Sequence, residues 1–503
     1  MPIRWGLCGF LIVSLLIIGC AGGGDDSSPG SGSDDDTTDD DSADDATDDD
    51  AGADDDTFPP LPDDDFDPDD DAADDDATGD AEPANVPIID ADGREIFLRG
   101  TNYMGLEYGG FDIHTPEDYA HIAEWGFNVV RIPIAWDYIE PEPGEYDMSY
   151  LTDVVEPAVG WAADAGLKVV LDFHQWNWCR PLGGNGMPDW ICEGAWYADL
   201  DWPFNILFAS GDWWRHPEYL DGFEAAWDLV SAHFAGDERI FAYDLFNEPM
   251  NGVGTLPSLF ENQKLRPLYV RLIETIRENH PEPWIFIEPA IIHVAGFPFV
   301  MDPLPYERLI FSPHVYPVEA ASGGGYTFGK PLIRRDVKQG RDEANRFGTP
   351  LVVGEFGMVS GAVGVAEYMR DVTDLFDEYL ASWTVWCWHH DDNQFGLVDN
   401  AGENKAVFFP SLARPYPRAT MGRVRSLAYD QVSVEFTMAF ENVEAGPPDT
   451  RIWLPEVFGD APEVWSSDAD GAWSWEFDAA TRELAITANP DEEWHVVTVT
   501  PGE

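Results

Sequence analysis

Two glutamates stand at the ends of short apolar segments, at widely separated points of the chain. Glu248 lies in Asn247-Glu-Pro249, and Glu355 lies in Gly354-Glu-Phe-Gly357. Breaking a glycosidic bond calls for two carboxyl groups that face each other across the bond, and retaining enzymes hold them about 5–5.5 Å apart. We therefore predict that Glu248 and Glu355 are the two catalytic carboxyls of a glycosidase.

Each glutamate also has an ordinary structural interpretation. The run Asn247-Glu-Pro249 alone is typical of a helix start, because Asn caps helices and Glu suits the first turn. A lone Glu after a strand, such as Glu355, is often simply solvated. Both motifs end apolar segments that would be strands four and seven of one barrel, which face each other across its mouth, and this favours catalysis.

Other polar and aromatic residues stand at the ends of further apolar segments. A cation at Arg131 would hold Glu355 ionised and oriented. Strand alternation predicts that Trp386 and Trp388 share a face, and one of them would form the floor beneath a sugar. The alternative for the arginine is a structural ion pair. The alternative for the histidines is a structural role, and for the tryptophans it is packing in the core. The candidates for substrate binding from this pattern are Arg131, His174, His314, Tyr316 and Trp386.

The elements that must position these residues are short apolar strands that alternate with amphipathic segments. Segments such as Tyr150–Ala165 and Lys330–Phe347 have apolar residues at helical spacing. Eight strands separated by helices predict an α/β fold, a (β/α)8 TIM barrel over residues 84–417, with its chemistry at the C-terminal strand ends. The predicted strands are Ile96–Asn102, Val129–Ile134, Lys168–Phe173, Ile240–Phe246, Trp284–Ile287, Leu309–Ser312, Leu351–Gly354 and Ser382–Trp388.

The pattern changes on both sides of the predicted barrel. Before its first strand, Asp92-Gly93 between two apolar runs predicts a β-hairpin. From residue 418 to residue 503, polar and apolar residues alternate without a helical stretch, which predicts a small β-sandwich. We find no catalytic cluster in that segment.

The first 83 residues have a different composition from the rest. Residues 1–20 combine Arg4, an apolar run and Cys20 after a small residue, which predicts a signal peptide. The ending resembles the lipobox of bacterial lipoproteins and implies acylation of Cys20; an ordinary cleaved signal is the alternative. Residues 21–83 contain 27 Asp, one Glu and no Lys or Arg, so we predict a disordered tether rather than a folded calcium site.

Charge and cysteines exclude several classes of protein. The formal net charge is −69, and −41 remains without residues 21–83, which argues against nucleic acid as a partner. Five cysteines are too few for a disulfide framework. A bridge between Cys179 and Cys192 is plausible in an oxidising compartment, and Cys387 is expected to be a buried thiol. We expect a monomer that needs no metal and no organic cofactor.

Together these residues resemble glycoside hydrolase family 5. The resemblance rests on the order of Asn128-Val-Val-Arg131, Asn247-Glu-Pro249, His314-Val-Tyr316, Gly354-Glu-Phe-Gly357 and Trp386. It implies a retaining β-glycosidase with Glu248 as the acid/base and Glu355 as the nucleophile. It also implies that Asn247 contacts the sugar 2-hydroxyl and that Tyr316 hydrogen-bonds the nucleophile.

A narrower resemblance is to endoglycoceramidases and related glycolipid β-glycosidases of that family. It rests on His174-Gln175, on Asp391-Asp-Asn-Gln-Phe-Gly-Leu-Val398 and above all on Arg414-Pro-Tyr-Pro-Arg-Ala-Thr-Met-Gly422. Those enzymes commonly have Asp after His-Gln, whereas this chain has Trp176, so a polar contact to the substrate is in doubt.

The resemblance implies cleavage of the glycan from a glycosphingolipid. Residues 1–20 imply that the enzyme is exported, either lipid-anchored at the cell surface or outer membrane or secreted. An aromatic-rich segment that begins at Trp176 suits a lipid aglycone, although its rings would also pack a core of their own. The alternatives are an endo-β-glucanase, a mannanase or a steryl glucosidase of the same family. A non-catalytic carbohydrate-binding protein of the cell surface is the alternative of another class.

Overall fold

A computed structural model describes residues 85–317, 325–327, 329–443 and 449–502 of the chain. The predicted signal peptide, Cys20 and the whole predicted tether lie outside these residues. The first described part is a barrel whose eight parallel strands lie in the order β10-β12-β3-β4-β5-β6-β7-β8. The strands are β3 (Arg99–Tyr103), β4 (Val129–Ile134), β5 (Lys168–Phe173), β6 (Ile240–Asp244), β7 (Trp284–Ile287), β8 (Leu309–Phe311), β10 (Val352–Val353) and β12 (Ser382–Trp388).

A parallel bridge between Phe311 and Leu351 joins β8 to β10 and closes the barrel. The eight predicted strands match the observed ones within three residues at each end. They were recognisable because strands of a parallel sheet are buried on both faces and therefore read as continuous apolar runs. Two further short strands, β9 (His314–Val315) and β11 (Glu355–Phe356), pair with each other above β8 and β10.

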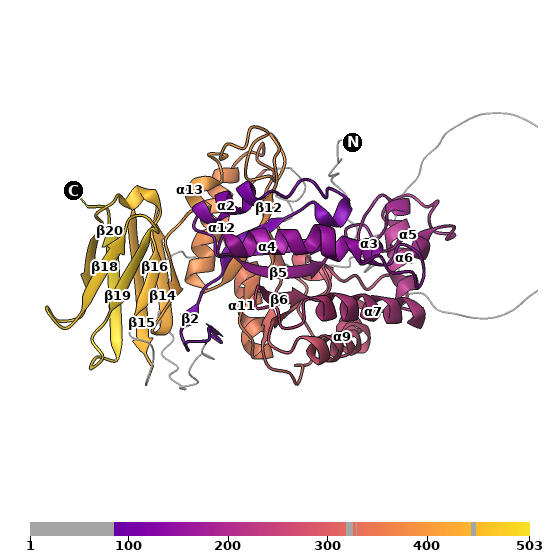
Figure 1. Cartoon of the computed structure of the whole chain (residues 1–503), viewed down its shortest axis with the longest axis horizontal. Helices are drawn as coiled ribbons and strands as arrows, with labels where there is room; N and C mark the ends of the chain where they lie inside the picture. The colour runs from indigo at the N-terminus through magenta and orange to yellow at the C-terminus, as the bar shows by residue number, and fades with distance from the viewer. Residues whose placement is uncertain (1–84, 318–324, 328, 444–448, 503) are drawn as a thin grey trace, which may run out of the picture. The chain divides into compact units, whose positions relative to one another are not determined.

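Helices connect the strands and cover the outside of the barrel, as α4, α7 and α9 do beside β5 and β6 in Figure 1. The predicted helix over Tyr150–Ala165 begins with a π-helical segment, Tyr150–Val155, and continues as α4. The helices are α2 (Pro116–Glu124), α3 (Trp136–Ile139), α4 (Glu156–Asp164), α5 (Asp189–Cys192), α6 (Phe204–Trp213), α7 (Pro217–His233), α8 (Pro257–Phe260), α9 (Arg266–Asn279), α11 (Lys330–Phe347), α12 (Val365–Glu378) and α13 (Phe409–Leu412).

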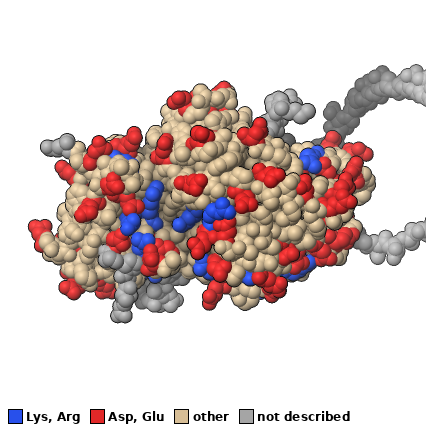
Figure 2. Space-filling view, in the orientation of Figure 1, with Lys and Arg blue, Asp and Glu red and all other residues tan. Residues whose placement is uncertain are grey.

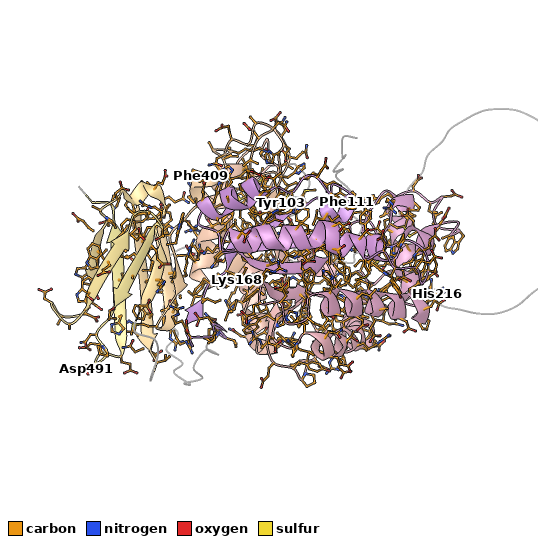
Figure 3. All side chains as sticks on the ribbon, viewed as in Figure 1. Tyr103, Phe111, Lys168, His216, Phe409 and Asp491 are labelled. Carbon is orange, nitrogen blue, oxygen red and sulfur yellow. A yellow bond between two sulfur atoms is a disulfide. The ribbon has the colours of Figure 1, made fainter. Side chains whose placement is uncertain are left out.

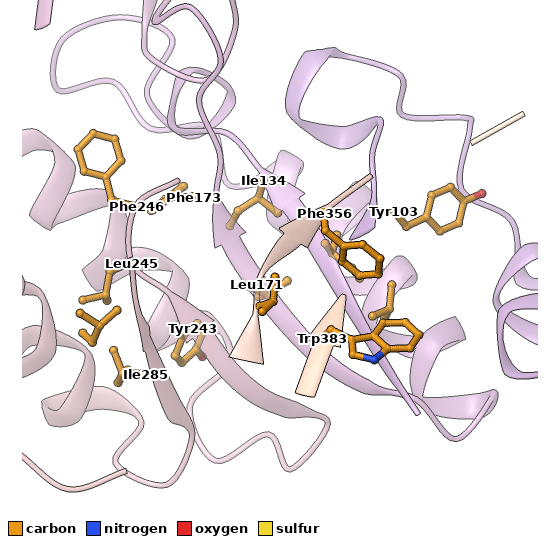
Figure 4. Close-up of a cluster of buried hydrophobic side chains, with 14 of the residues drawn as sticks. Tyr103, Ile134, Leu171, Phe173, Tyr243, Leu245, Phe246, Ile285, Phe356 and Trp383 are labelled. Carbon is orange, nitrogen blue, oxygen red and sulfur yellow. The ribbon is translucent and has the colours of Figure 1, made fainter. Parts of the chain in front are cut away.

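Strand alternation divides the apolar side chains of the barrel into two cores. One core lies between the strands and the helices, and Figure 4 shows part of it, with Leu171, Phe356 and Trp383 among the labelled residues. The other core fills the barrel interior near the start of the strands; its members include Leu98, Val129, Val170, Ala242, Phe286, Ile310 and Val352. This apolar layer supports the polar residues that point inward at the opposite end.

The direction of the strands shows at which end of the barrel they finish, and one βα unit is enough to read it. Lys168 begins β5 and His216 precedes α7, and the two residues lie far apart along the barrel in Figure 3. The strands therefore run toward the end where the segment before α7 lies. We call this end the mouth.

The predicted hairpin forms below the barrel, where β1 (Ile88–Ile89) pairs with β2 (Glu95–Ile96). Glu95 bridges to Thr420 and accepts a hydrogen bond from the amide of Val424 at 2.8 Å, so the hairpin contacts the C-terminal segment. A buried ion cluster of Arg99, Asp377 and Arg414 lies in the same region. These contacts join the base of the barrel to the domain that follows.

The predicted β-sandwich is present as two four-stranded antiparallel sheets, β13-β16-β19-β18 and β14-β15-β20-β17. Its first strand contains Pro417, which an edge strand tolerates because one side of it needs no ladder hydrogen bonds. The strands are β13 (Tyr416–Ala419), β14 (Gly422–Asp430), β15 (Glu435–Asn442), β16 (Thr450–Trp453), β17 (Glu463–Ser466), β18 (Ser474–Asp478), β19 (Glu483–Thr487) and β20 (Trp494–Thr500).

The predicted common face of Trp386 and Trp388 is wrong. The pairing of β12 with β3 shifts in register between Val385 and Trp388, so simple alternation fails there. Trp388 is fully buried in the core around Trp125, whereas Trp386 belongs to a separate cluster with Cys387. Only Trp386 remains available to a substrate.

Acidic side chains dominate the surface of the described residues. Figure 2 shows them spread over the visible face, where basic side chains are few. Among the described residues, no helix has the length and apolar character needed to cross a bilayer.

Candidate active site

The two candidate carboxylates lie at the mouth on opposite strands of the barrel. Glu248 follows β6 by four residues, and its backbone adopts a left-handed φ of 48°. Glu355 is the first residue of β11, which follows β10 directly. One carboxylate oxygen of Glu248 and one of Glu355 lie within 4.8 Å of each other. This separation is near the value for retaining glycosidases and well below that for inverting ones.

His314 stands between the two carboxylates. Its Nδ1 lies 3.1 Å from Glu248 Oε1 and 3.6 Å from Glu355 Oε2. Its Nε2 lies 3.2 Å from Oε1 of Glu288. The imidazole therefore links the candidate acid/base, the candidate nucleophile and a third carboxylate that the sequence pattern did not single out.

Arg131 is the fully buried centre of the polar layer inside the barrel. Its Nη1 donates to Glu355 Oε1 at 2.9 Å, as the sequence predicts. The same guanidinium also contacts Asp172 at 3.1 Å, Asp244 at 2.9 Å and Glu288 at 2.9 Å. Those three carboxylates are close enough together to hold a metal ion. Here the Arg131 guanidinium supplies the positive charge among them.

Glu288 follows β7 and is 2% exposed. Its Oε1 accepts from Arg131 Nη2, and its Oε2 accepts from the backbone amide of Glu248 at 2.7 Å. Together with the contact to His314, these bonds tie the catalytic groups from three strands to one buried carboxylate. Glu288 thereby fixes the left-handed backbone that presents the Glu248 side chain.

His174 and Trp386 form one wall of the mouth. Their rings are stacked with centroids 5.2 Å apart. Nδ1 of His174 lies 2.8 Å from Asp172 Oδ2, and Asp172 is also an Arg131 partner. This bond fixes the orientation of the imidazole and leaves its other nitrogen for a sugar hydroxyl.

Tyr316 and Asn247 complete the predicted set. The Tyr316 hydroxyl donates to Glu355 Oε2 at 3.0 Å, as the family resemblance implies. Asn247 accepts from Arg131 Nη2 and donates to the carbonyl of Gln175. Gln175 in turn donates to the carbonyls of Asn247 and Glu248, both at 3.2 Å. The amide network therefore holds the loop that carries the acid/base.

Protonation of the catalytic pair depends on His314. Burial alone would lower the pKa of His314, but the charges of Glu288 and Glu355 and the hydrogen bond to Glu248 raise it well above its ordinary value. Burial raises the pKa of Glu355 despite the opposing charges of His314 and Arg131. Burial acts in the same direction on Glu248, but the hydrogen bond and charge of His314 outweigh it and lower its pKa.

A negative Glu355 nearby would by itself raise the pKa of Glu248, but the charged imidazole of His314 reverses the direction of the shift. The two carboxyls and His314 interact strongly enough to titrate as one unit, and in the free site the hydrogen bond from His314 keeps Glu248 ionised.

A lid of aromatic residues covers one side of the mouth between β5 and α7. The predicted disulfide between Cys179 and Cys192 is present in it, and Cys387 is a buried free thiol. Three of the lid's tryptophans are buried and belong to the main core of the barrel, where each ring packs beside Phe246: Trp178, Trp213 and Trp214.

Other lid residues are exposed, together with apolar residues of the loop that follows Glu248. The backbone amide of Val253 donates to the carbonyl of Leu207 in α6 at 3.0 Å, so the two segments are in contact. We call the exposed apolar residues of both segments the apolar rim. They are Trp196, Trp202, Phe204, Val253, Leu256 and Leu259, with exposed fractions from 36% to 64%.

Sequence reasoning missed the buried acids Asp172, Asp244 and Glu288. A signal for them is present, since each stands in or directly after an apolar strand at a position that alternation points into the barrel. A charged side chain inside an apolar strand needs a partner, and Arg131 on the neighbouring β4 is that partner.

Comparison with known proteins agrees with this geometry. The model of the cellulase family, glycosyl hydrolase family 5, matches residues 89–392. The model of the glycoside hydrolase family 5 C-terminal domain matches residues 414–500. Endoglycoceramidase I of Rhodococcus hoagii is 24% identical over 415 residues, which are 76% of this chain and 81% of that protein.

Comparison with solved structures also finds similarity to endoglycoceramidases. Endo-glycoceramidase II from Rhodococcus sp., in complex with ganglioside GM3, is 28% identical with a TM-score of 0.74, over 83% of this chain and 100% of that chain. The lactosyl-enzyme intermediate of that protein is 27% identical with a TM-score of 0.72, over the same shares of 83% and 100%.

Proposed function

Because the chain belongs to glycosyl hydrolase family 5, we propose that it is a retaining β-glycosidase that releases the glycan of a glycosphingolipid. The observation that carries the mechanism is the separation of at most 4.8 Å between carboxylate oxygens of Glu248 and Glu355. Carboxyls this close leave no room for a water molecule to attack directly between them, and a double displacement follows.

In the first displacement Glu355 attacks the anomeric carbon while Glu248 protonates the leaving oxygen. Arg131 and Tyr316 both donate to Glu355, so they stabilise its anion and orient it. In the second displacement Glu248 takes a proton from water, and the resulting hydroxide equivalent releases the sugar from Glu355.

The proton that Glu248 needs is available from His314. Movement of one proton along the 3.1 Å contact converts charged His314 and ionised Glu248 into neutral His314 and neutral Glu248. Substrate entry expels water, which disfavours the charged pair relative to the neutral one. The neutral imidazole keeps its Nε2 proton toward Glu288, so the transfer leaves this contact intact.

The apolar rim supports a lipid as the leaving group. It is built from the segments that follow His174 and Glu248, and Glu248 marks the side of the leaving oxygen. Contiguous exposed apolar residues beside a site are typical of interaction with a lipid or a protein. The Rhodococcus structure with ganglioside GM3 has the same fold, and we extend its class of substrate to this chain.

We further propose that the chain is exported and held at the cell surface through acylated Cys20. This proposal rests on the apolar run and the lipobox-like ending of residues 1–20. Stable anchoring requires more than one acyl chain, and lipoprotein acylation supplies several. Metabolic labelling with a clickable fatty acid would label the wild-type protein, and a Cys20→Ser variant that is labelled equally would exclude the anchor.

The substrate is tested with a panel of a ganglioside, glucosylceramide, a steryl glucoside and a soluble β-glucan. We expect an intact oligosaccharide and ceramide from the ganglioside, with the β-anomer of the sugar appearing first by proton NMR. Turnover of the β-glucan alone would replace the glycolipid proposal by a glucanase, and turnover of the steryl glucoside alone by a steryl glucosidase. First appearance of the α-anomer would exclude the retaining mechanism.

A further inference from the structure

The outer face of one sheet of the β-sandwich carries two exposed tryptophans. Trp465 on β17 pairs with Thr498 on β20, and Trp494 lies four residues before Thr498 on the same strand. Paired residues of antiparallel strands, and residues an even number apart on one strand, point to the same face. Val497 and Val499 of β20 are fully buried, so the face that carries the tryptophans is the outer one.

The exposure of these two rings is unusual. Trp465 is 57% exposed and Trp494 is 50% exposed. Regular strands place both at fixed points of a rigid surface. A large apolar ring left open to solvent on such a surface is a sign of binding rather than of packing.

The side chains between the two tryptophans are small or carry hydroxyl groups. Thr437 pairs with Thr498, and their Oγ1 atoms lie 3.3 Å apart. Ala439 pairs with Val496 in the next row of the face. The face is therefore shallow between the two rings. Trp465 lies in the row of Thr498, which is offset from Trp494 by four positions, or about 13 Å along β20 at roughly 3.3 Å per residue.

Charges on and around the face exclude anionic occupants. Glu441 pairs with Trp494 and is held by Arg425, whereas Glu463, two residues before Trp465 on β17, is exposed on the same face. The chain outside residues 21–83 has a formal net charge of −41, which repels nucleic acids, acidic polysaccharides and anionic membranes. Alternating rings and hydroxyls also break the continuous apolar surface that a lipid would need. An uncharged sugar chain fits this face, because it carries no charge to be repelled, its C–H faces suit the aromatic rings and its hydroxyls suit the threonines.

We propose that this face of the β-sandwich binds an extended, uncharged polysaccharide, with Trp465 and Trp494 stacking on sugar rings at its two ends. The face is separate from the catalytic carboxylates, so binding here does not depend on the proposed glycolipid reaction. Its role is to hold the enzyme on a glycan-coated surface.

Affinity electrophoresis of the full chain in native gels tests this proposal. Gels would contain a soluble uncharged β-glucan, a glucomannan, or dextran sulfate as an anionic probe. We expect at least one uncharged polysaccharide to retard the wild-type protein and dextran sulfate to leave it unchanged. Trp465→Ala and Trp494→Ala should each weaken the apparent affinity about tenfold, as for truncated aromatic hot spots, and the double variant should migrate as in a blank gel.

Trp475→Ala is the matched control, because Trp475 is 39% exposed on β18 of the other sheet. This variant should be retarded like the wild type, and thermal unfolding should confirm that all variants fold. Unchanged retardation of the double variant, equal loss with Trp475→Ala, preferential retardation by dextran sulfate, or no retardation of the wild type by either uncharged polysaccharide would each overturn the proposal. Hydrolysis of a small aryl glycoside, measured in parallel, reports on the active site alone.

Discussion

Oε2 of Glu288 accepts the backbone N–H of Glu248 at 2.7 Å, so one buried carboxylate fixes the main chain of the residue proposed as the acid/base. The other oxygen of Glu288 contacts both Arg131 and His314. A side chain outside the reacting pair therefore controls where Glu248 points and how strongly His314 holds its proton. The dependence of activity on pH can separate these two effects.

Glu288→Gln should lower kcat/KM about 100-fold, because an amide cannot accept from all three donors and a small displacement of Glu248 is costly. Loss of the Glu288 charge also lowers the pKa of His314, so His314 loses its positive charge at lower pH. Neutral His314 lowers the pKa of Glu248 less than charged His314 does. The basic limb of the profile of kcat/KM against pH should therefore move to higher pH. Glu343→Gln, which disturbs the buried contact to His293, is the control, and an unshifted profile in Glu288→Gln would reduce Glu288 to a structural role.

His314→Asn should move both limbs of the pH profile upward. The charge of His314 lowers the pKa of Glu248 and also opposes the raised pKa of Glu355. Without that charge, Glu355 ionises at higher pH and Glu248 stays protonated to higher pH. The profile of kcat/KM between pH 4 and pH 9 measures both limbs, with His293→Asn as the control. A downward shift of either limb would contradict the assignment.

Glu248→Ala and Glu355→Ala should differ in their response to the leaving group. Without the acid, turnover of a glycolipid should fall by about 10²–10⁴, whereas a dinitrophenyl glycoside, whose leaving group needs no proton, should still form the covalent intermediate. Pre-steady-state release of dinitrophenol detects that step. Without the nucleophile, neither substrate should react. Equal losses on both substrates in Glu248→Ala would argue against its role as acid.

Stability should fall as the pH rises from 5 to 8. Burial raises the pKa of Glu95 from 4.5 to about 7, although the hydrogen bond from Val424 opposes it. A carboxyl with a raised pKa stabilises the fold fully below 4.5, and this contribution is lost as the pH rises through 7. Glu95→Gln keeps an acceptor for Val424 and should be more stable than the wild type at pH 8, by up to about 3 kcal/mol, with little difference at pH 4.5.

Chemical denaturation at both pH values measures this effect. Exposed Glu463 provides the control, since Glu463→Gln should leave the dependence on pH unchanged. If the wild-type protein were more stable at pH 8 than at pH 5, groups other than Glu95 would dominate the dependence of stability on pH.

The disulfide between Cys179 and Cys192 should stabilise the lid rather than the whole barrel. It closes a short segment, for which about 3 kcal/mol is typical. The variant with both cysteines changed to Ser should be cleaved faster by protease within residues 176–214 and should retain its barrel. Cys387→Ser, which removes the free thiol, should leave the cleavage rate unchanged; faster cleavage spread over the whole chain in the double variant would indicate a global effect.

Much of the barrel was predictable because its strands are buried on both faces. Val129–Ile134 and Ser382–Trp388 were identified with the observed bounds. Glu248 and Glu355 were identifiable because both follow such strands, and the mouth of a barrel is where those strand ends meet.

Properties that depend on several distant residues were not predictable in the same way. The lowered pKa of Glu248 requires the position of His314 between two carboxylates, which no local pattern encodes. The orientation of Trp388 depends on a register shift of β12, and a shift of one residue turns a side chain to the other face. Exposure of Trp196 but burial of Trp178 depends on how the lid packs against the barrel core.

The centre and the edge of this site have different structural origins. Arg131 and its carboxylate partners belong to the strands or directly follow them, whereas the apolar rim belongs to two loops, one of them clipped by a disulfide. The exposed positions of the rim, such as Trp196 and Phe204, can therefore change without touching the reacting carboxyls, whereas Trp214 packs beside Phe246 and donates to the carbonyl of Met250 in the loop that carries Glu248. For enzyme design, these exposed positions are where substitution would direct one hydrolytic centre to other leaving groups.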